Sequence, residues 1–97
     1  MEIKGKNVLV FGAGVSGVSA AQVLQEQGAV VTLADAKDRR HAKAAALLGP
    51  LTGKVELALG RDGEELLDGK DLFIISPGIS IHHPLAQKAE QRGIPVW

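Results

Sequence analysis

The sequence contains no cysteine and no tyrosine, and its only aromatic residues are two phenylalanines and one tryptophan. Without cysteine the chain has no disulfide, no thiolate metal site and no cysteine nucleophile. So few aromatic side chains also argue against the stacked-base platforms that bind single-stranded nucleic acid.

A net charge is also missing, because 11 lysine and arginine residues balance 11 aspartate and glutamate residues. No overall field therefore recruits nucleic acid or an anionic membrane. The apolar runs are far shorter than a membrane span, and the N-terminus has no secretory pattern. We therefore expect a cytoplasmic domain with no nucleic-acid partner and no membrane partner.

Hydrophobic residues make up 45% of the 97 residues, which is enough for the core of one domain. Apolar runs bounded by turn residues predict strands over 7–11, 29–34, 55–59, 71–76 and 94–97. Helical patterns between them predict helices over 16–27, 41–48 and 84–92, with a short helical turn over 64–67. In the first helix an apolar stripe is formed by Val18, Ala21 and Leu24 and is widened by Val23.

Strands that alternate with helices predict an α/β fold with a parallel sheet. The uniformly apolar strands indicate a sheet that helices cover on both faces, as in a Rossmann-like three-layer sandwich. We expect five strands in the order 3-2-1-4-5, with the segment 55–59 at an edge. Residues 1–97 would form one domain, and we expect it to be the N-terminal fragment of a longer multidomain protein.

The most informative stretch is a glycine loop that follows the first apolar run. Gly12, Gly14 and Gly17 have the spacing G-x-G-x-x-G, and a helical pattern begins by Ser16. A strand, a tight turn and a helix in this order offer free backbone N–H groups to a phosphate. Gly12 would turn the chain, Gly14 would let a diphosphate approach, and Gly17 would let the helix pack on the strand. The alternative is an ordinary glycine-rich turn.

In an open parallel sheet a ligand lies beyond the carboxyl ends of the strands, where the winding direction reverses. The loops 12–17, 35–37 and 76–80 are expected to meet there. In the last of them Ser76 offers a hydroxyl group, and Gly78 leaves room for a ligand against its backbone. Its position opposite the glycine loop favours a binding site over a plain Pro-Gly turn.

Asp35 ends the second strongly apolar run and has more than one interpretation. It could accept hydrogen bonds from ribose hydroxyls, as in nicotinamide dehydrogenases, or contact another part of a nucleotide. The alternative is a helix cap or a solvated acid in a loop. Nearby, Lys37 could help to neutralise phosphates, although a solvated basic loop is the commoner explanation.

No catalytic or metal site can be assigned from the residue pattern. The three histidines, His41, His82 and His83, are too scattered for a metal centre, and His83 before Pro84 predicts the start of a helix. A mild acidic cluster is typical of a solvated face and consists of Glu64, Glu65, Asp68 and Asp71. We therefore expect a binding site without catalytic residues and without a metal.

The glycine loop together with the Ser-Pro-Gly-Ile stretch resembles the N-terminal part of the Mur ligases. The matching segments are 5–10, 12–17, 28–31, Asp35, 76–79 and 83–84. The resemblance covers essentially the whole chain. Within the family it is strongest to the cytoplasmic enzymes that add D-glutamate to UDP-N-acetylmuramoyl-L-alanine during peptidoglycan precursor synthesis.

This resemblance implies that the chain binds the UDP part of UDP-N-acetylmuramoyl-L-alanine. The full-length enzyme would be an ADP-forming amide-bond ligase that uses ATP and Mg²⁺ in a central domain and binds D-glutamate with the help of a C-terminal domain. The P-loop string G-x-x-x-x-G-K-[ST] does not occur in this sequence. We therefore expect no cofactor in this fragment and no activity of the fragment alone. We also expect a monomer.

The resemblance also implies which residues contact the nucleotide. The diphosphate would meet Gly14, Val15, Ser16 and Gly17, the uracil would lie by Asp35, Ala36 and Lys37, and the uridine would be lined from the opposite side by Ser76, Pro77, Gly78 and Ile79. One departure is that relatives can carry a hydroxyl residue where this chain has Ala36, so a side-chain contact to the base is lost. An alternative function is an NAD(P)-binding domain of a dehydrogenase or a nucleotide-sensing regulatory module.

Overall fold

The structure is a computed structural model and describes residues 3–36, 53–76 and 83–97. Its centre is a parallel sheet of β1 (Asn7–Phe11), β2 (Val30–Asp35), β3 (Glu56–Leu59) and β4 (Leu72–Ile75). The strand order is β3-β2-β1-β4. The connecting segments contain α1 (Val15–Glu26), the 3₁₀ helix η2 (Glu64–Leu67) and α3 (Pro84–Gln91).

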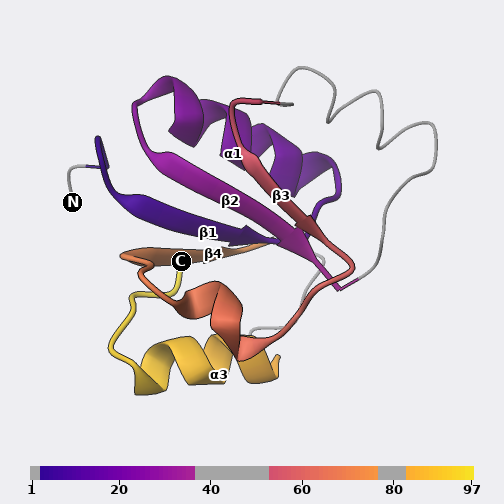
Figure 1. The fold of residues 1–97 in the computed structure, drawn as a ribbon, viewed down its shortest axis with the longest axis vertical. Helices are drawn as coiled ribbons and strands as arrows, with labels where there is room; N and C mark the ends of the chain where they lie inside the picture. The colour runs from indigo at the N-terminus through magenta and orange to yellow at the C-terminus, as the bar shows by residue number, and fades with distance from the viewer. Residues whose placement is uncertain (1–2, 37–52, 77–82) are drawn as a thin grey trace.

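Helices cover both faces of the sheet, with α1 on one side and η2 and α3 on the other (Figure 1). Successive side chains of a strand point to opposite faces, so each strand contributes to two cores. Val8 and Val10 of β1 pack in the cluster that contains the α1 residues Val18 and Ala21. The alternate β1 and β4 side chains pack with η2 and α3 in a second cluster, which includes Leu9, Phe11, Leu66, Leu67, Phe73, Leu85, Ala86 and Ala89.

The predicted α/β class, the parallel sheet and the order of the first four strands are confirmed. The prediction of five strands is wrong, because the sheet of the described residues has four. Residues 95–97 do lie beside β4, where Phe73 N–H donates to the Pro95 carbonyl and Trp97 N–H donates to the Phe73 carbonyl. They form only an isolated bridge between Phe73 and Val96. Pro95 has no N–H to donate, so the pairing does not extend toward the amino end of this segment.

Two further predictions concern helices. Val23 is 51% exposed and therefore does not widen the apolar stripe of α1. Successive helix residues are rotated by about 100°, so Val23 lies about 200° from the buried Ala21. The predicted helix over 41–48 falls outside the described residues. Within 3–36, 53–76 and 83–97 no helix is long and apolar enough to cross a membrane.

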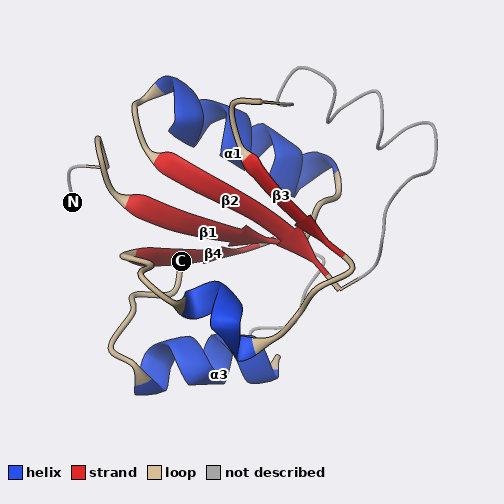
Figure 2. Ribbon diagram, viewed as in Figure 1, coloured by secondary structure: helices blue, strands red, loops and turns tan. Residues whose placement is uncertain are grey.

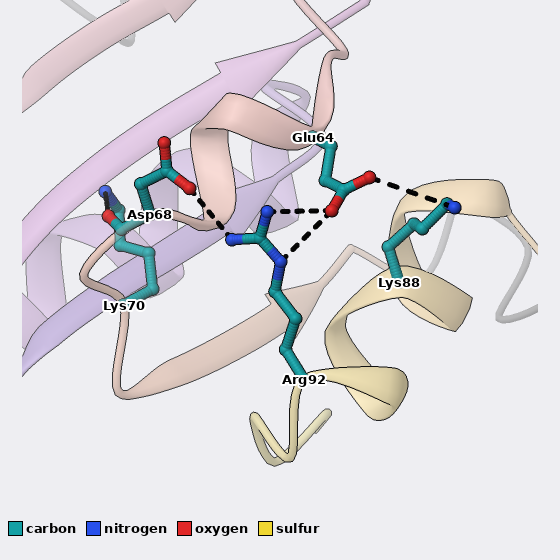
Figure 3. Close-up of polar contacts among 5 residues, drawn as sticks. All are labelled: Glu64, Asp68, Lys70, Lys88 and Arg92. Carbon is teal, nitrogen blue, oxygen red and sulfur yellow. Dashed lines mark hydrogen bonds and ion pairs between the residues drawn. The ribbon is translucent and has the colours of Figure 1, made fainter.

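An ion-pair network joins η2 to α3 on the surface (Figure 3). The Arg92 guanidinium donates from Nη1 to Asp68 Oδ1 at 2.8 Å and from Nη2 to Glu64 Oε2 at 2.7 Å. Lys88 Nζ also lies 3.8 Å from Glu64 Oε1. The hydrogen bond to Asp68, which has the larger effect, and the hydrogen bonds to Glu64 raise the pKa of Arg92 above its usual value. The guanidinium therefore stays charged. The acidic cluster therefore includes a tether between two helices that are far apart in the sequence.

Replacing Arg92 by glutamine should lower the melting temperature only slightly, because exposed ion pairs stabilise proteins weakly. We expect a loss of about 2–6 °C. The control is Arg61→Gln, because Arg61 makes one longer ion pair among the described residues, 3.6 Å from Glu65. We expect it to change the melting temperature by about 1 °C or less. Thermal melts in about 1 M NaCl should remove most of the difference, since salt screens exposed charges. An Arg92 effect that is unchanged by salt would contradict an electrostatic tether.

Candidate functional site

The carboxyl ends of all four strands lie at one edge of the sheet, as their arrowheads show in Figure 2. In the strand register Phe11, the last residue of β1, pairs with Ala34 of β2 and with Ile75 of β4. Main-chain hydrogen bonds continue past the strand ends, with Gly12 N–H donating to the Ala34 carbonyl at 2.8 Å and Ser76 N–H donating to the Phe11 carbonyl at 2.9 Å. The structure therefore brings together the starts of the three loops that were predicted to meet.

The glycine loop turns at Gly12, whose φ of +109° is a conformation that favours glycine. Gly14 has an ordinary extended backbone, with φ −78° and ψ −170°, and is the N-cap of α1. A Cβ atom at Gly14 would meet nothing within 4 Å, whereas a Cβ atom at Gly17 would overlap the Gly12 carbonyl oxygen. The roles predicted for Gly12 as the turn and for Gly17 as the close-packing residue are confirmed.

Within the described part of the chain, the N-terminus of α1 presents backbone N–H groups that have no side-chain cap. Gly14 makes no side-chain capping bond, and the first turn contains no acidic residue. Val18 N–H donates to the Gly14 carbonyl at 3.0 Å, so the amides of Val15, Ser16 and Gly17 precede the first intrahelical bond. Ser16 is exposed beside them. The arrangement is suited to an anion, because the amides and the helix dipole both favour negative charge.

The side chain of Asp35 contacts the backbone of the glycine loop. Its side chain is buried, with the residue only 2% exposed, and its Oδ2 atom accepts a hydrogen bond from Ala13 N–H at 2.8 Å. The Asp35 carbonyl in turn accepts from Arg61 N–H at 3.0 Å. Ala36, the next residue, is exposed. The sequence pattern placed Asp35 at the end of a strand but did not indicate this bond to Ala13.

On the other side of the glycine loop, Ser76 is 8% exposed at the end of β4. Beyond the next loop His83 starts α3, and its Nδ1 atom accepts a hydrogen bond from Leu85 N–H at 3.1 Å. This confirms the predicted helix-start role of His83. Its ring also lies against Phe11, with centroids 4.9 Å apart, so the start of α3 packs against the end of β1. The predicted contact residues Lys37, Pro77, Gly78 and Ile79 lie outside the described residues.

Two further observations concern a metal site and a hollow elsewhere on the sheet. Among residues 3–36, 53–76 and 83–97 no group of three or more histidine, aspartate or glutamate side chains is arranged to hold a metal ion. A hollow of ≈ 470 Å³ lies at the opposite edge of the sheet, where its lining includes Gly28, Val30, Lys54 and Glu56. Because β2 and β3 begin there, this hollow is separate from the glycine loop.

Comparison with known proteins gives two kinds of relative. One is UDP-N-acetylmuramoylalanine–D-glutamate ligase of Streptomyces coelicolor, which is 45% identical over 97 residues that cover 99% of this chain and 20% of the relative. The ligase of the same name from Koribacter versatilis is 38% identical over 96 residues, covering 99% of this chain and 21% of the relative. The chain thus spans about a fifth of the length of these curated relatives.

Solved structures show the same fold. A pseudomurein peptide ligase type C from Methanothermus fervidus matches with a TM-score of 0.76 and 20% identity over 96% of this chain and 19% of that chain. SirC, a precorrin-2 dehydrogenase, matches with a TM-score of 0.69 and 18% identity over 99% of this chain and 45% of that chain. The family profile of the Mur ligase MurD-like N-terminal domain matches residues 6–97. The chain therefore belongs to the Mur ligase family, as a MurD-like N-terminal domain.

Proposed function

We propose that this chain binds the UDP part of UDP-N-acetylmuramoyl-L-alanine, as the N-terminal domain of the ligase that adds D-glutamate to it. The observation that carries the proposal is the uncapped N-terminus of α1 at the point where the ends of β1, β2 and β4 meet. Parallel sheets bind nucleotides at this position, and phosphates favour such helix termini. The family to which the chain belongs supports UDP as the nucleotide.

The diphosphate would lie on residues 14–17. Gly14 leaves the approach open, because no atom lies within 4 Å of the position of a Cβ atom there. Successive amides of the first turn would donate to phosphate oxygens, and Ser16 adds an exposed hydroxyl group. No carboxylate in the first turn of α1 opposes an anion. Binding here would thus come from backbone N–H groups, with Lys37 as the expected source of positive charge.

The uridine would lie between the other two loops. Residues 35–37 would border the uracil, and residues 76–79 would line the uridine from the opposite side. The exposed Ala36 offers backbone groups and no side-chain hydrogen bond, so contacts to the base from this residue would be made by the main chain. At the opposite loop the described part is Ser76, which lies beside Gly12 through its main-chain bond to Phe11.

The longer protein would carry out the chemistry. It would use ATP and Mg²⁺ to activate the substrate carboxyl group and join D-glutamate to it, releasing ADP. The present sequence has no P-loop string, so groups that hold ATP and Mg²⁺ would belong to the other four-fifths of such a ligase. The fragment would therefore release no phosphate from ATP, even with both substrates present. We also propose that it is a cytoplasmic monomer.

Titration of the ¹⁵N-labelled chain tests the nucleotide. We expect UDP to bind at least about tenfold more tightly than NAD, a difference of about 1.4 kcal/mol. The amide signals that move should be those of residues 12–17 and of Ala36, because these lie at the proposed site. The full substrate, UDP-N-acetylmuramoyl-L-alanine, should move the same signals.

Three results would contradict parts of the proposal. Tighter binding of NAD than of UDP would place the chain with the nicotinamide-dependent dehydrogenases or with nucleotide-sensing modules. Shifts confined to the hollow at the amino ends of β2 and β3 would move the nucleotide to the other edge of the sheet. Phosphate release from ATP above a protein-free blank would contradict the predicted inactivity of the fragment.

A further inference from the structure

The buried carboxylate of Asp35 accepts a hydrogen bond from the backbone of the glycine loop. Asp35 is 2% exposed, and its Oδ2 atom accepts from Ala13 N–H at 2.8 Å across 22 positions of sequence. Burying a carboxylate is costly unless strong hydrogen bonds compensate for lost hydration. A bond between a backbone amide and an ionised carboxylate is among the stronger protein hydrogen bonds. A side chain that only packed in the core would not need a carboxylate at this position.

The peptide that Asp35 holds is the one that sets the path of the loop. Ala13 lies between Gly12, which turns the chain with φ +109°, and Gly14, the N-cap of α1. The Gly12 amide is also bound by β2, through the Ala34 carbonyl at 2.8 Å. The end of β2 therefore holds two successive amides, one with its main chain and one with the Asp35 side chain.

The main chain of Asp35 is fixed as well, because its carbonyl accepts a hydrogen bond from Arg61 N–H at 3.0 Å. The residue is thus held between the glycine loop and the segment that follows β3. Ala13 is 0% exposed, so its amide is bonded to the carboxylate and not to bulk water. Removing the carboxylate would leave a buried donor without a partner, which is destabilising to the conformation that buries it.

We propose that Asp35 is a positioning residue, which holds the Ala13 peptide so that the amides of residues 14–17 point at the diphosphate. This role rests on the proposed UDP binding, and it gives Asp35 an effect on the phosphates in addition to its proposed place beside the uracil. The acceptor oxygen carries the function. Asparagine, which keeps one oxygen in nearly the same place, should therefore largely replace aspartate.

Amide hydrogen exchange tests the bond without any ligand. In Asp35→Ala the Ala13 amide should exchange about ten- to a hundredfold faster, the size expected for losing a hydrogen bond to a charged group. The Gly12 amide is the internal control, because its acceptor is the Ala34 carbonyl and remains in place. Asp35→Asn should restore slow exchange to within about threefold of the parent. Unchanged exchange at Ala13 in Asp35→Ala would overturn the proposal.

Ligand titrations then separate positioning from direct contact. UDP, inorganic pyrophosphate and uridine are titrated into the parent, Asp35→Ala and Asp35→Asn. Positioning predicts that Asp35→Ala weakens pyrophosphate roughly tenfold and weakens UDP by at least the same factor, whatever its effect on uridine. Weaker binding of uridine and UDP with unchanged pyrophosphate would overturn it in favour of a nucleoside contact. A parent chain that binds none of the three would refute UDP binding, and the exchange result would still decide whether Asp35 holds the loop.

One measurement covers the case in which Asp35→Ala does not fold. A scalar coupling across the hydrogen bond, between the Ala13 amide nitrogen and the Asp35 carboxyl carbon, is measurable in the parent chain. Its presence supports the bond directly, and the folded Asp35→Asn variant then supplies the ligand comparison. Absence of the coupling in the parent would overturn the proposal.

Discussion

Replacing Gly17 by alanine is expected to destroy most of the stability of the chain. Gly17 is buried in α1, and a Cβ atom there would overlap the Gly12 carbonyl oxygen and lie 2.9 Å from its carbon. Both atoms belong to backbone, so neither can rotate away, and α1 would have to move off the end of β1. We expect a loss of about 3–5 kcal/mol, and a fall in melting temperature of roughly 12 °C or more.

Gly63→Ala is the matched control for this substitution. Its added Cβ atom would also meet neighbouring atoms too closely, but all three belong to the Glu65 carboxylate, and Glu65 is exposed. Because a flexible side chain can swing into solvent, we expect a change of about 0.5 kcal/mol or less. Urea unfolding of both variants measures the difference. Equal stability of Gly17→Ala and the parent would mean that α1 does not approach Gly12 as closely as described.

Most of the fold follows from local patterns that agree with one another. The run 7–11 is apolar at nearly every position because the sheet has helices on both faces, and alternate residues of β1 enter different cores. The left-handed turn at Gly12 and the close approach at Gly17 follow from the loop spacing alone. These predictions succeeded because each depends on residues adjacent in sequence or on one strand register.

Two of the missed features depend on tertiary contacts. The Arg92 network joins residues that are 24 and 28 positions apart, and charged side chains at those positions fit a solvated face equally well. For Asp35 the sequence indicates a strand end, but the direction of the carboxylate depends on where Ala13 lies in space. The sequence signal for this bond was a carboxylate, Asp35, at the end of an apolar run and near a glycine turn with free amides. The prediction that Val23 widens the apolar stripe failed for a different reason, since an apolar residue is tolerated on an exposed helix face.

Gly14→Val should show the opposite behaviour to Gly17→Ala, with the fold retained and the nucleotide lost. Gly14 has φ −78° and ψ −170°, which valine adopts readily, and a Cβ atom there meets nothing within 4 Å. The cost to folding should be about 0.5–1 kcal/mol, because valine is a poorer N-cap than glycine. This backbone needs no glycine conformation, so the effect of the substitution on ligand binding can be separated from its effect on folding.

The proposed diphosphate fills the open space in front of Gly14, and the valine side chain would occupy it. We expect UDP to bind at least about thirtyfold more weakly, or about 2 kcal/mol, the size of one charged hydrogen bond lost. Gly14→Ala should lie between the parent and Gly14→Val, because the methyl group blocks less of the approach. Thermal melts establish that both variants are folded before the titrations are compared. If folded Gly14→Val binds UDP as well as the parent, the diphosphate does not lie on this loop, and the N-terminus of α1 must be given another role.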